Sequence, residues 1–239
     1  MEAIIEISNL TKRFVNCEAL RGVDMIIPKD RIVGLLGPNA SGKTTLLKTM
    51  AGLLQPTAGS VRYYEDAEPG PDARQTISFC PDVLVFRRWM RVRDAFAFYE
   101  GVYSDYSQTR ADEIMRILEL QNIADTHIRN ISRGMRERLA LGLTFSRDTK
   151  LYLLDEPLDG IDPIGKMKVQ DAILALQPEG ASTIVSTHLV KDIERIFTDV
   201  YFLSKGKVIF SGACDVMREE RGQTVEQTYL EVFINEGSV

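Results

Sequence analysis

Short hydrophobic runs alternate with predicted helices over most of this chain. Residues 32–36 (Ile-Val-Gly-Leu-Leu) form one such run, which is typical of a strand buried in a sheet. A helix is predicted after it and ends at the breakers Pro56 and Gly59. The same succession recurs later, where strands 151–154 and 183–186 are each followed by a predicted helix. Hydrophobic strands that alternate with helices predict an α/β fold with a mainly parallel sheet and helices on both faces.

The middle of the chain has a different pattern. Residues 109–120 place hydrophobic side chains on one helical face and Arg and Glu on the other. We therefore expect a helical subdomain at about 91–146, inserted into an α/β core made of residues 1–90 and 147–239, within a single domain. The remaining predicted elements are strands at 3–9, 19–27, 60–64, 77–80, 199–204 and 207–211, helices at 43–53, 94–99, 136–145, 163–176 and 189–197, and a helical stretch at 213–235.

Composition narrows the classes of function. The chain has 239 residues, a formal net charge of −5 and a pI near 5.3, which argues against bulk electrostatic affinity for nucleic acid. Cys17, Cys80 and Cys214 have no C-x-x-C spacing, so we expect reduced thiols of a cytosolic protein rather than a metal site. The sequence has no stretch of about 18 apolar residues. A role at a membrane would therefore require docking onto another protein.

The nine residues after the first buried strand carry the strongest chemical signal. They fill the pattern G-x-x-x-x-G-K-[ST] between a strand and a helix, which is typical of a phosphate-binding loop. Glycines permit the tight turns that point N–H groups at phosphates, and the helix presents its positive end to the same anion. We expect Lys43 to reach the β- and γ-phosphates and the Thr44 hydroxyl to bind Mg²⁺. The residues predicted to bind a nucleoside triphosphate here are Gly37, Pro38, Asn39, Ala40, Ser41, Gly42, Lys43, Thr44 and Thr45.

Two acidic residues follow the hydrophobic run 151–154. Acids at the C-terminal end of a buried strand lie where ligands bind in open α/β sheets. Asp155 is predicted to hold Mg²⁺, and Glu156 to polarise an attacking water as a general base. The alternative is two surface acids that open a loop, which the complete phosphate loop disfavours.

A third segment, Ser132-Arg133-Gly134, places a hydroxyl and a glycine N–H before a helix. Alone it indicates an ordinary helix N-cap, but it lies late in the helical insert and shortly before the acid-ended strand. With these three segments in order, the chain resembles the nucleotide-binding domain of ATP-binding cassette (ABC) proteins along essentially its whole length. The resemblance implies a P-loop NTPase with a mainly parallel sheet, an antiparallel β subdomain and an inserted α-helical subdomain. That subdomain would carry the family signature at residues 132–136.

The resemblance also implies roles for single residues. Asp162 matches the acid of the D-loop, and His188 is similar to the histidine that senses the γ-phosphate. Phe14 lies where the family stacks an aromatic ring on adenine, with a core position as the alternative. Asp82 stands where the family has a glutamine that contacts Mg²⁺ and water. The predicted site thus comprises Lys43, Glu156 and His188 as catalytic residues, Phe14, residues 37–45, Ser132, Gly134 and Asp162 for ATP, and Thr44, Asp82 and Asp155 for Mg²⁺.

Four residues depart from the family pattern. Ala40 replaces the commoner glycine in the phosphate loop, and it fits if its backbone avoids positive φ. Arg133 and Met135 replace Gly and Gln of the usual signature, and such variants occur in members that resemble multidrug and antibiotic exporters. Asp82 is one methylene shorter than glutamine and adds a negative charge near the metal. We expect either slower hydrolysis or a contact through water.

By family analogy, one chain carries half of each working site. ATP on residues 37–45 of one copy would be capped by Ser132 and Gly134 of another, in a homodimer or a heterodimer. The implied function is the ATP-hydrolysing subunit of an ABC transporter, cytoplasmic and attached to the inner face of the cell membrane through a separate permease subunit. Export is favoured over import because the stretch 228–233 resembles the short tail of exporter-type members.

Two alternatives remain open from the sequence. A soluble ABC ATPase of translation or DNA repair is the alternative function, although the single cassette and the short helical insert favour transport. A module that only binds ATP is disfavoured because Glu156 and His188 are both present. The segment 86–93, with four arginines and the only tryptophan, is expected to receive the permease, and Arg88 and Trp89 are the residues to test. A basic surface loop is the alternative for that segment.

Overall fold

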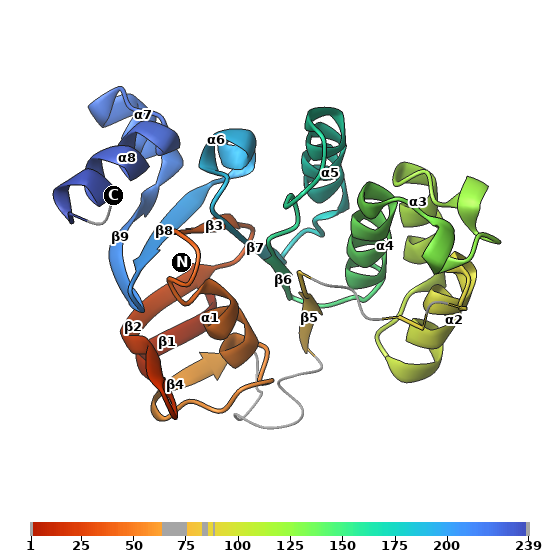
Figure 1. The fold of residues 1–239 in the computed structure, drawn as a ribbon, viewed down its shortest axis with the longest axis horizontal. Coiled ribbons are helices and arrows are strands. Elements are labelled where there is room, and N and C mark those ends of the chain that lie inside the picture. The colour runs from red at the N-terminus through yellow and green to blue at the C-terminus, as the bar shows by residue number, and fades with distance from the viewer. Residues whose placement is uncertain (1, 64–75, 83–85, 88, 238–239) are drawn as a thin grey trace.

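The protein is described by a computed structural model that covers residues 2–63, 76–82, 86–87 and 89–237, shown in Figure 1. Its larger sheet has six strands in the order β5-β6-β7-β3-β8-β9. Neighbouring strands are parallel except β9, which pairs antiparallel with β8. The strand bounds are β3 (Ile32–Leu36), β5 (Ile77–Cys80), β6 (Leu151–Asp155), β7 (Ser182–Thr187), β8 (Asp199–Ser204) and β9 (Lys207–Ala213).

The three central strands are covered on both faces. Every residue of β3, β6 and β7 is buried. Successive side chains of a strand point to opposite faces, so Leu151 and Leu153 belong to one hydrophobic core and Tyr152 and Leu154 to the other. Burial on both faces explains why these strands appear in the sequence as unbroken hydrophobic runs.

The smaller sheet is antiparallel, in the order β2-β1-β4. It consists of β1 (Ala3–Phe14), β2 (Cys17–Pro28) and β4 (Ala58–Tyr63). Helix α1 (Lys43–Met50) contributes Leu46, Leu47 and Met50 to the core that this sheet shares with one face of the larger sheet. Hydrophobic packing on α1 therefore fixes the helix that follows the phosphate loop.

Helices α2 (Val92–Val102), α3 (Gln108–Ile117) and α4 (Arg133–Phe145) lie together at one end of the molecule, beyond β5 (Figure 1). They pack closely around Gly142 of α4. A Cβ atom there would lie 3.2–3.3 Å from Phe96, Ile114 and Leu118. The first turn of α4 is capped by Ser132, whose hydroxyl accepts the Met135 N–H.

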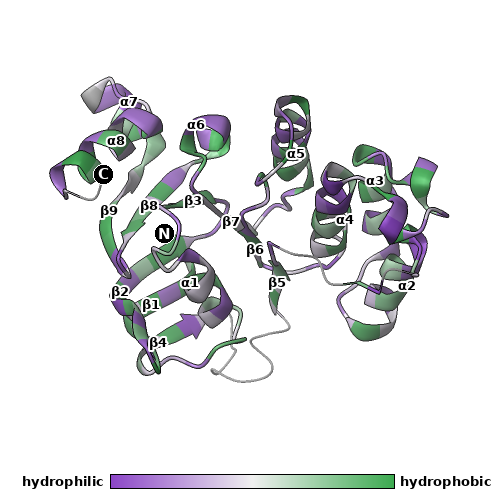
Figure 2. Cartoon of the chain, viewed as in Figure 1, coloured by the Kyte–Doolittle hydropathy of each residue, from purple (hydrophilic) through white to green (hydrophobic). Residues whose placement is uncertain are grey.

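The remaining helices are α5 (Pro163–Leu176), α6 (Val190–Ile193), α7 (Cys214–Arg221) and α8 (Val225–Asn235). The helices that cover the larger sheet carry hydrophobic and hydrophilic residues side by side (Figure 2), as expected when one helical face meets the core. The three cysteine thiols are free, and no described helix is long and apolar enough to cross a membrane.

The predicted order of strands and helices and the fold class are confirmed. The strand predicted at 3–9 runs on to Phe14, and the helical stretch predicted at 213–235 is divided into α7 and α8. The predicted helix 43–53 ends at Met50. The predicted helix 189–197 is a short α-helix followed by a 3-10 turn, Glu194–Ile196. Tyr64, the last residue of the predicted strand 60–64, lies outside the described residues.

Candidate functional site

The phosphate loop connects β3 to α1, and two of its glycines are required by close backbone contacts. A Cβ atom on Gly37 would lie 2.2 Å from the Leu203 carbonyl oxygen, and one on Gly42 would lie 2.6 Å from that of Ala19. Gly42 also has φ 112°, outside the range that other residues adopt. The first turn of α1 has neither a side-chain cap nor an acidic residue. Its N–H groups and positive dipole end are therefore suited to an anion.

Ala40 was predicted to fit the phosphate loop if its backbone avoided positive φ, and this condition is not met. Its φ is 63°, in the left-handed region where an L-residue is strained by its Cβ atom. The loop keeps a conformation that suits glycine even though alanine occupies the position. This strain is a property of the loop that the sequence motif alone does not reveal.

Lys43 is buried at the start of α1, with a side-chain exposure of 5%. Its Nζ donates to the carbonyl oxygens of Gly37 (2.8 Å) and Pro38 (3.1 Å) and lies 3.1 Å from Oε1 of Glu156. An ammonium group has three protons, and these three acceptors match them. The loop thus holds the lysine side chain folded back over its own backbone.

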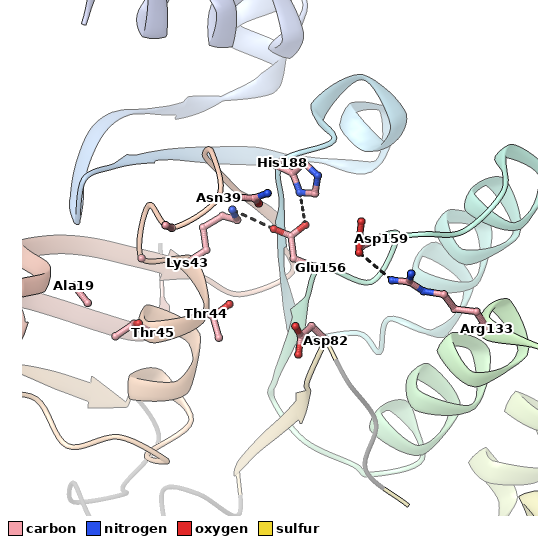
Figure 3. Close-up of a pocket in the computed structure, with 12 residues that line it drawn as sticks. Ala19, Asn39, Lys43, Thr44, Thr45, Asp82, Arg133, Glu156, Asp159 and His188 are labelled. Atoms are coloured by element: carbon pink, nitrogen blue, oxygen red, sulfur yellow. Dashed lines mark hydrogen bonds and ion pairs between the residues drawn. The ribbon is translucent and has the colours of Figure 1, made fainter. Parts of the chain in front are cut away.

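Glu156 links Lys43 to His188. Its second carboxylate oxygen, Oε2, lies 3.0 Å from Nδ1 of His188, which must donate because a carboxylate only accepts. Glu156 has φ 49°, and its N–H is bonded to the backbone and side-chain oxygens of Ser186 at 3.1 Å each. These bonds to β7 hold the residue in its left-handed conformation. Figure 3 shows Lys43 and His188 meeting the Glu156 carboxylate.

Asp155, at the end of β6, is buried beneath Thr44. Its Oδ1 accepts hydrogen bonds from the hydroxyls of Thr44 (3.1 Å) and Ser186 (2.6 Å). Burial raises the pKa of the Asp155 carboxyl, the two hydroxyls oppose that rise, and the negative charges of Asp82 and Glu156 add to it. Its Oδ2 is buried and has no hydrogen-bond partner among the described residues.

These oxygen atoms suit a hard divalent cation such as Mg²⁺, which prefers oxygen ligands and usually keeps several waters. Thr44 and Asp155 offer a hydroxyl and an unpartnered carboxylate oxygen. Within the described ranges there is no group of three or more His, Cys, Asp or Glu side chains placed to hold a metal. A cation here would therefore complete its coordination with water or with phosphate oxygens.

The phosphate loop opens into a cavity of about 480 Å³. Arg133 reaches it from the first turn of α4, and its guanidinium lies 2.9 Å from a carboxylate oxygen of Asp159 (Figure 3). The cavity is lined by Ala19, Asn39, Ala40, Gly42, Lys43, Thr44, Thr45, Asp82, Arg133, Glu156, Asp159 and His188. Most of the phosphate loop, all three predicted catalytic residues and Asp82 are thus brought together.

Gly37, Pro38 and Ser41 of the phosphate loop do not line this cavity, and neither do the four predicted ATP-binding residues outside the loop. Ser132, Gly134 and Asp162 line a second cavity of about 440 Å³ between the first turns of α4 and α5. Phe14 lines neither of these two cavities. It lies at the end of β1 beside the turn to β2, is 44% exposed, and has the Lys12 ammonium 5.2 Å from its ring centroid. The alternative core position for Phe14 is therefore wrong.

Comparison with known proteins supports the same interpretation. A family model described as ABC transporter matches residues 20–159, which is more than half of the chain. The chain belongs to the ABC transporter family. The family assignment, the ATP-binding function and the ATPase class predicted from the sequence are confirmed, and the chain is an ATP-binding subunit of an ABC transporter.

Relatives of the ABC chain include bacterial transport proteins. It is 28% identical over 225 residues to the uncharacterized ABC transporter ATP-binding protein YxlF of Bacillus subtilis, covering 93% of this chain and 75% of that protein. It is 27% identical to the lantibiotic transport ATP-binding protein SrtF of Streptococcus pyogenes, covering 89% and 92%. It is 30% identical to the probable multidrug ABC transporter ATP-binding protein YbhF of Escherichia coli, covering 97% of this chain and 42% of that protein.

Solved structures show the same fold. An ATP-binding subunit of an ABC transporter superimposes with a TM-score of 0.83 at 22% identity and covers 96% of this chain and 99% of its own. The cbiO1 protein of Clostridium perfringens, part of the cbiONQ transporter complex, gives a TM-score of 0.78 at 21% identity, with 98% and 96% covered. The ABC ATPase fold, with its mostly parallel and antiparallel sheets, is thereby confirmed.

Sequence reasoning missed two features of this ABC site. The first is the pair between Arg133 and Asp159, for which Gly160 leaves room, since a Cβ there would lie 2.0 Å from the guanidinium. The second is Ser186, which bonds both Asp155 and the Glu156 N–H. Ser186 follows a hydrophobic run on the strand beside β6, so its position at the same sheet edge was a signal that could have been read.

Proposed function

We propose that this chain hydrolyses Mg-ATP at a site shared between two copies of an ABC subunit and thereby drives export through a separate membrane subunit. The observation that carries the proposal is the connected set Lys43–Glu156–His188 at the mouth of the phosphate loop. It combines a phosphate-binding cation, a carboxylate base and a histidine that orients the base.

The resting contacts of Lys43 suggest how the base is released. Its ammonium is shared between two loop carbonyls and Glu156. A γ-phosphate is a stronger competitor for an ammonium than a single carboxylate, because it carries more negative charge and more acceptor oxygens. ATP binding would draw Lys43 away from Glu156. The freed carboxylate, still held by His188, would then accept the proton of an attacking water.

Thr44 and Asp155 are the proposed holders of Mg²⁺, together with Asp82. When bound, the ion would neutralise charge on the β- and γ-phosphates. Ser186 keeps Asp155 in place through its 2.6 Å hydrogen bond. The adenine contact of Phe14 remains a proposal, and the partial exposure of Phe14 supports it.

The test of the hydrolytic role is Glu156→Gln. The amide keeps the shape of the side chain but cannot act as a base, so we expect ATP binding within about threefold of wild type and a loss of turnover of about 100-fold or more. Titration calorimetry and phosphate release measure the two quantities. Full turnover of this variant would remove Glu156 from the role.

The two separate cavities support a shared site. No residue of the phosphate loop lines the cavity bordered by Ser132, Gly134 and Asp162, and the first turns of α4 and α5 both border it. Such N-termini favour an anion, so a triphosphate presented by a second copy fits the chemistry of this cavity. The phosphate loop of one copy and the signature of the other would together enclose ATP.

Mixing two inactive variants tests the shared site. Ser132→Ala damages only the signature, and Glu156→Gln only the base, so a mixed dimer contains one intact site and one doubly damaged site. If two copies of this chain pair at random, we expect the mixture to recover about a quarter of wild-type turnover. No recovery, with each variant still dimerising on ATP in light scattering, would mean that Ser132 and Glu156 of two copies do not meet in one site.

The proposed surface for the membrane subunit lies on α2 and the segment that leads into it. Trp89 is 64% exposed, and Phe98 and Val102 on α2 are also exposed. Phe86 packs edge-on against Phe98, with ring centroids 6.3 Å apart, and joins the segment to the helix. Exposed aromatic side chains next to arginines are typical of interface cores. Arg88, predicted to take part, lies outside the described residues.

Hydrogen bonds hold the backbone at Trp89 and Met90 in place. The Nδ1–H of His127 donates to the Trp89 carbonyl oxygen at 2.7 Å. The backbone N–H of Ile128 donates to the Met90 carbonyl oxygen at 2.9 Å. A pre-ordered surface loses less entropy on binding. We expect Trp89→Ala with Phe98→Ala to abolish co-purification with the permease while ATP binding is kept. Leu230→Ala with Ile234→Ala, two equally exposed residues on α8, is the matched control and should leave co-purification unchanged.

Export is favoured by the names of relatives. The chain is similar to lantibiotic and probable multidrug transport proteins. It is also 27% identical to a Nod factor export ATP-binding protein, covering 96% of this chain and 72% of that protein. We propose a peripheral position at the inner face of the membrane, where ATP and the permease are both within reach. Loss of the chain from washed membranes when the permease is deleted would support it, and unchanged membrane attachment would contradict it.

A further inference from the structure

The ion pairs of the phosphate cavity leave one of its acids unmatched. Three carboxylates line the cavity, those of Asp82, Glu156 and Asp159, together with the cations of Lys43 and Arg133. Lys43 pairs with Glu156 and Arg133 pairs with Asp159. Asp82 has neither an ion pair nor a hydrogen bond within the described part of the chain. Figure 3 shows it between Thr44 and Arg133 with no interaction drawn to it.

A second uncompensated carboxylate lies behind the cavity wall. Asp155 is 1% exposed, and Thr44, which lines the cavity, donates to its Oδ1. Its Oδ2 is buried without a hydrogen-bond partner among the described residues. An ionised buried carboxylate with an unsatisfied oxygen costs free energy, so a cation placed at this oxygen would be stabilising.

Thr44 links Asp82 to Asp155. It lines the cavity together with Asp82, and its hydroxyl donates to Oδ1 of Asp155 at 3.1 Å. Two carboxylates with oxygen donors and no cationic partner match the charge and ligand preference of one hard divalent cation. A glutamine at position 82 would supply a neutral oxygen and only one negative charge would remain.

We propose that Asp82, Asp155 and the Thr44 hydroxyl form a divalent-cation site that is occupied by Mg²⁺ before ATP arrives. The inference rests on the proposed Mg-ATP function and deepens it. With a single carboxylate, the ion depends on nucleotide phosphates for most of its binding energy. With two carboxylates, the chain binds the ion by itself, and the ion then adds to the positive charge that attracts the triphosphate.

The experiment uses Mn²⁺ alone, without nucleotide, as a spectroscopically visible hard cation. We expect the whole chain to bind one Mn²⁺ in titration calorimetry and in electron paramagnetic resonance of the free ion, with Mg²⁺ competing. Asp82→Asn should weaken this binding about tenfold or more, because it removes one of two ligand charges. Asp148→Asn, an exposed aspartate outside this cavity, is the matched control and should leave Mn²⁺ binding unchanged.

Titrating the wild type with Mn²⁺ alone and, separately, with Mg-ATP separates this inference from the proposed function. Asp82→Gln should lose Mn²⁺ binding in the absence of nucleotide. The inference would be overturned if the wild type did not bind Mn²⁺, or if Asp82→Asn bound Mn²⁺ as tightly as the wild type. In either case, binding of Mg-ATP by the wild type would still support the proposed function. If the wild type bound neither Mn²⁺ nor Mg-ATP, both would fail. Asp82 is exposed, and an unchanged thermal unfolding midpoint without added metal checks that the variants are folded.

Discussion

The two halves of the ATP-binding machinery differ in how far a single chain completes them. Around the phosphate loop, Lys43, Glu156 and His188 form a continuous set of bonds at the end of the central sheet. Around the signature, Ser132 and Asp162 cap the first turns of their own helices and border an open cavity. The first half is therefore pre-organised by its own core, whereas the second presents a surface for another molecule.

Two ion pairs show the same contrast in energetic terms. The Lys43–Glu156 pair has side chains 5% and 15% exposed, and the Arg133–Asp159 pair has both side chains 53% exposed. Removing one partner of a buried pair leaves a desolvated charge and is strongly destabilising, whereas an exposed pair is worth about 0–1 kcal/mol. Similar distances, 3.1 and 2.9 Å, therefore have different consequences.

The largest predicted effect comes from Lys43→Ala, compared with Arg133→Ala. We expect Lys43→Ala to weaken ATP binding about 100-fold or more, which is about 2.7 kcal/mol, because it removes the phosphate-binding cation and leaves Glu156 without its lysine partner. Arg133→Ala should change ATP affinity of the isolated chain less than about threefold. Calorimetry of both variants makes the comparison, and equal losses would erase the proposed difference between the two halves.

A smaller effect is predicted for pH. Burial raises the pKa of Glu137 on α4 from 4.5 to about 7, with the charges of Asp159 and Asp82 adding to the rise and those of Arg133 and Arg136 opposing it. Between these two pKa values the folded chain keeps a proton that the unfolded chain loses. The stability contributed by protonated Glu137 is therefore present below about pH 4.5 and lost as pH rises through about 7.

Urea unfolding at pH 5, 6 and 7.5 measures this contribution in wild type and Glu137→Gln. After allowance for solvent screening, we expect the stability difference between the two proteins to change by about 1–2 kcal/mol over that range. Other titrating groups cancel in the comparison. Parallel pH profiles of the two proteins would show that Glu137 does not titrate there.

The smallest predicted effect concerns the strained loop. Ala40→Gly relieves the left-handed backbone at φ 63°, worth about 1–2 kcal/mol, but adds about 0.5–1 kcal/mol of unfolded-state entropy. We expect a net gain of about 0.5 kcal/mol, or a rise of about 1–2 °C in the unfolding midpoint. Calorimetric scans decide the sign, and a lower midpoint would mean that the loop relaxes around alanine.

The sequence predicted the local parts of this protein well, for physical reasons. The phosphate loop is a contiguous motif between a hydrophobic strand and a helix, and its glycines are placed by contacts such as that of Gly37 with Leu203. Asp155 and Glu156 were found because they end a buried strand. The pairing of Arg133 with Asp159 was not predicted, because it joins segments that are distant in the sequence. The negative charge of Asp82 was predicted, but not that it has no ion pair among the described residues. The φ of Ala40 was missed because a motif specifies residue types and not strain.

Calorimetric titration of ATP into the folded chain, with and without Mg²⁺, tests most directly whether the phosphate loop binds a nucleotide. We expect saturable binding of one ATP per chain that is strengthened by Mg²⁺ and is lost in Lys43→Ala. If wild-type chain that is folded by circular dichroism and unfolds cooperatively did not bind ATP, the phosphate loop would not be a nucleotide site.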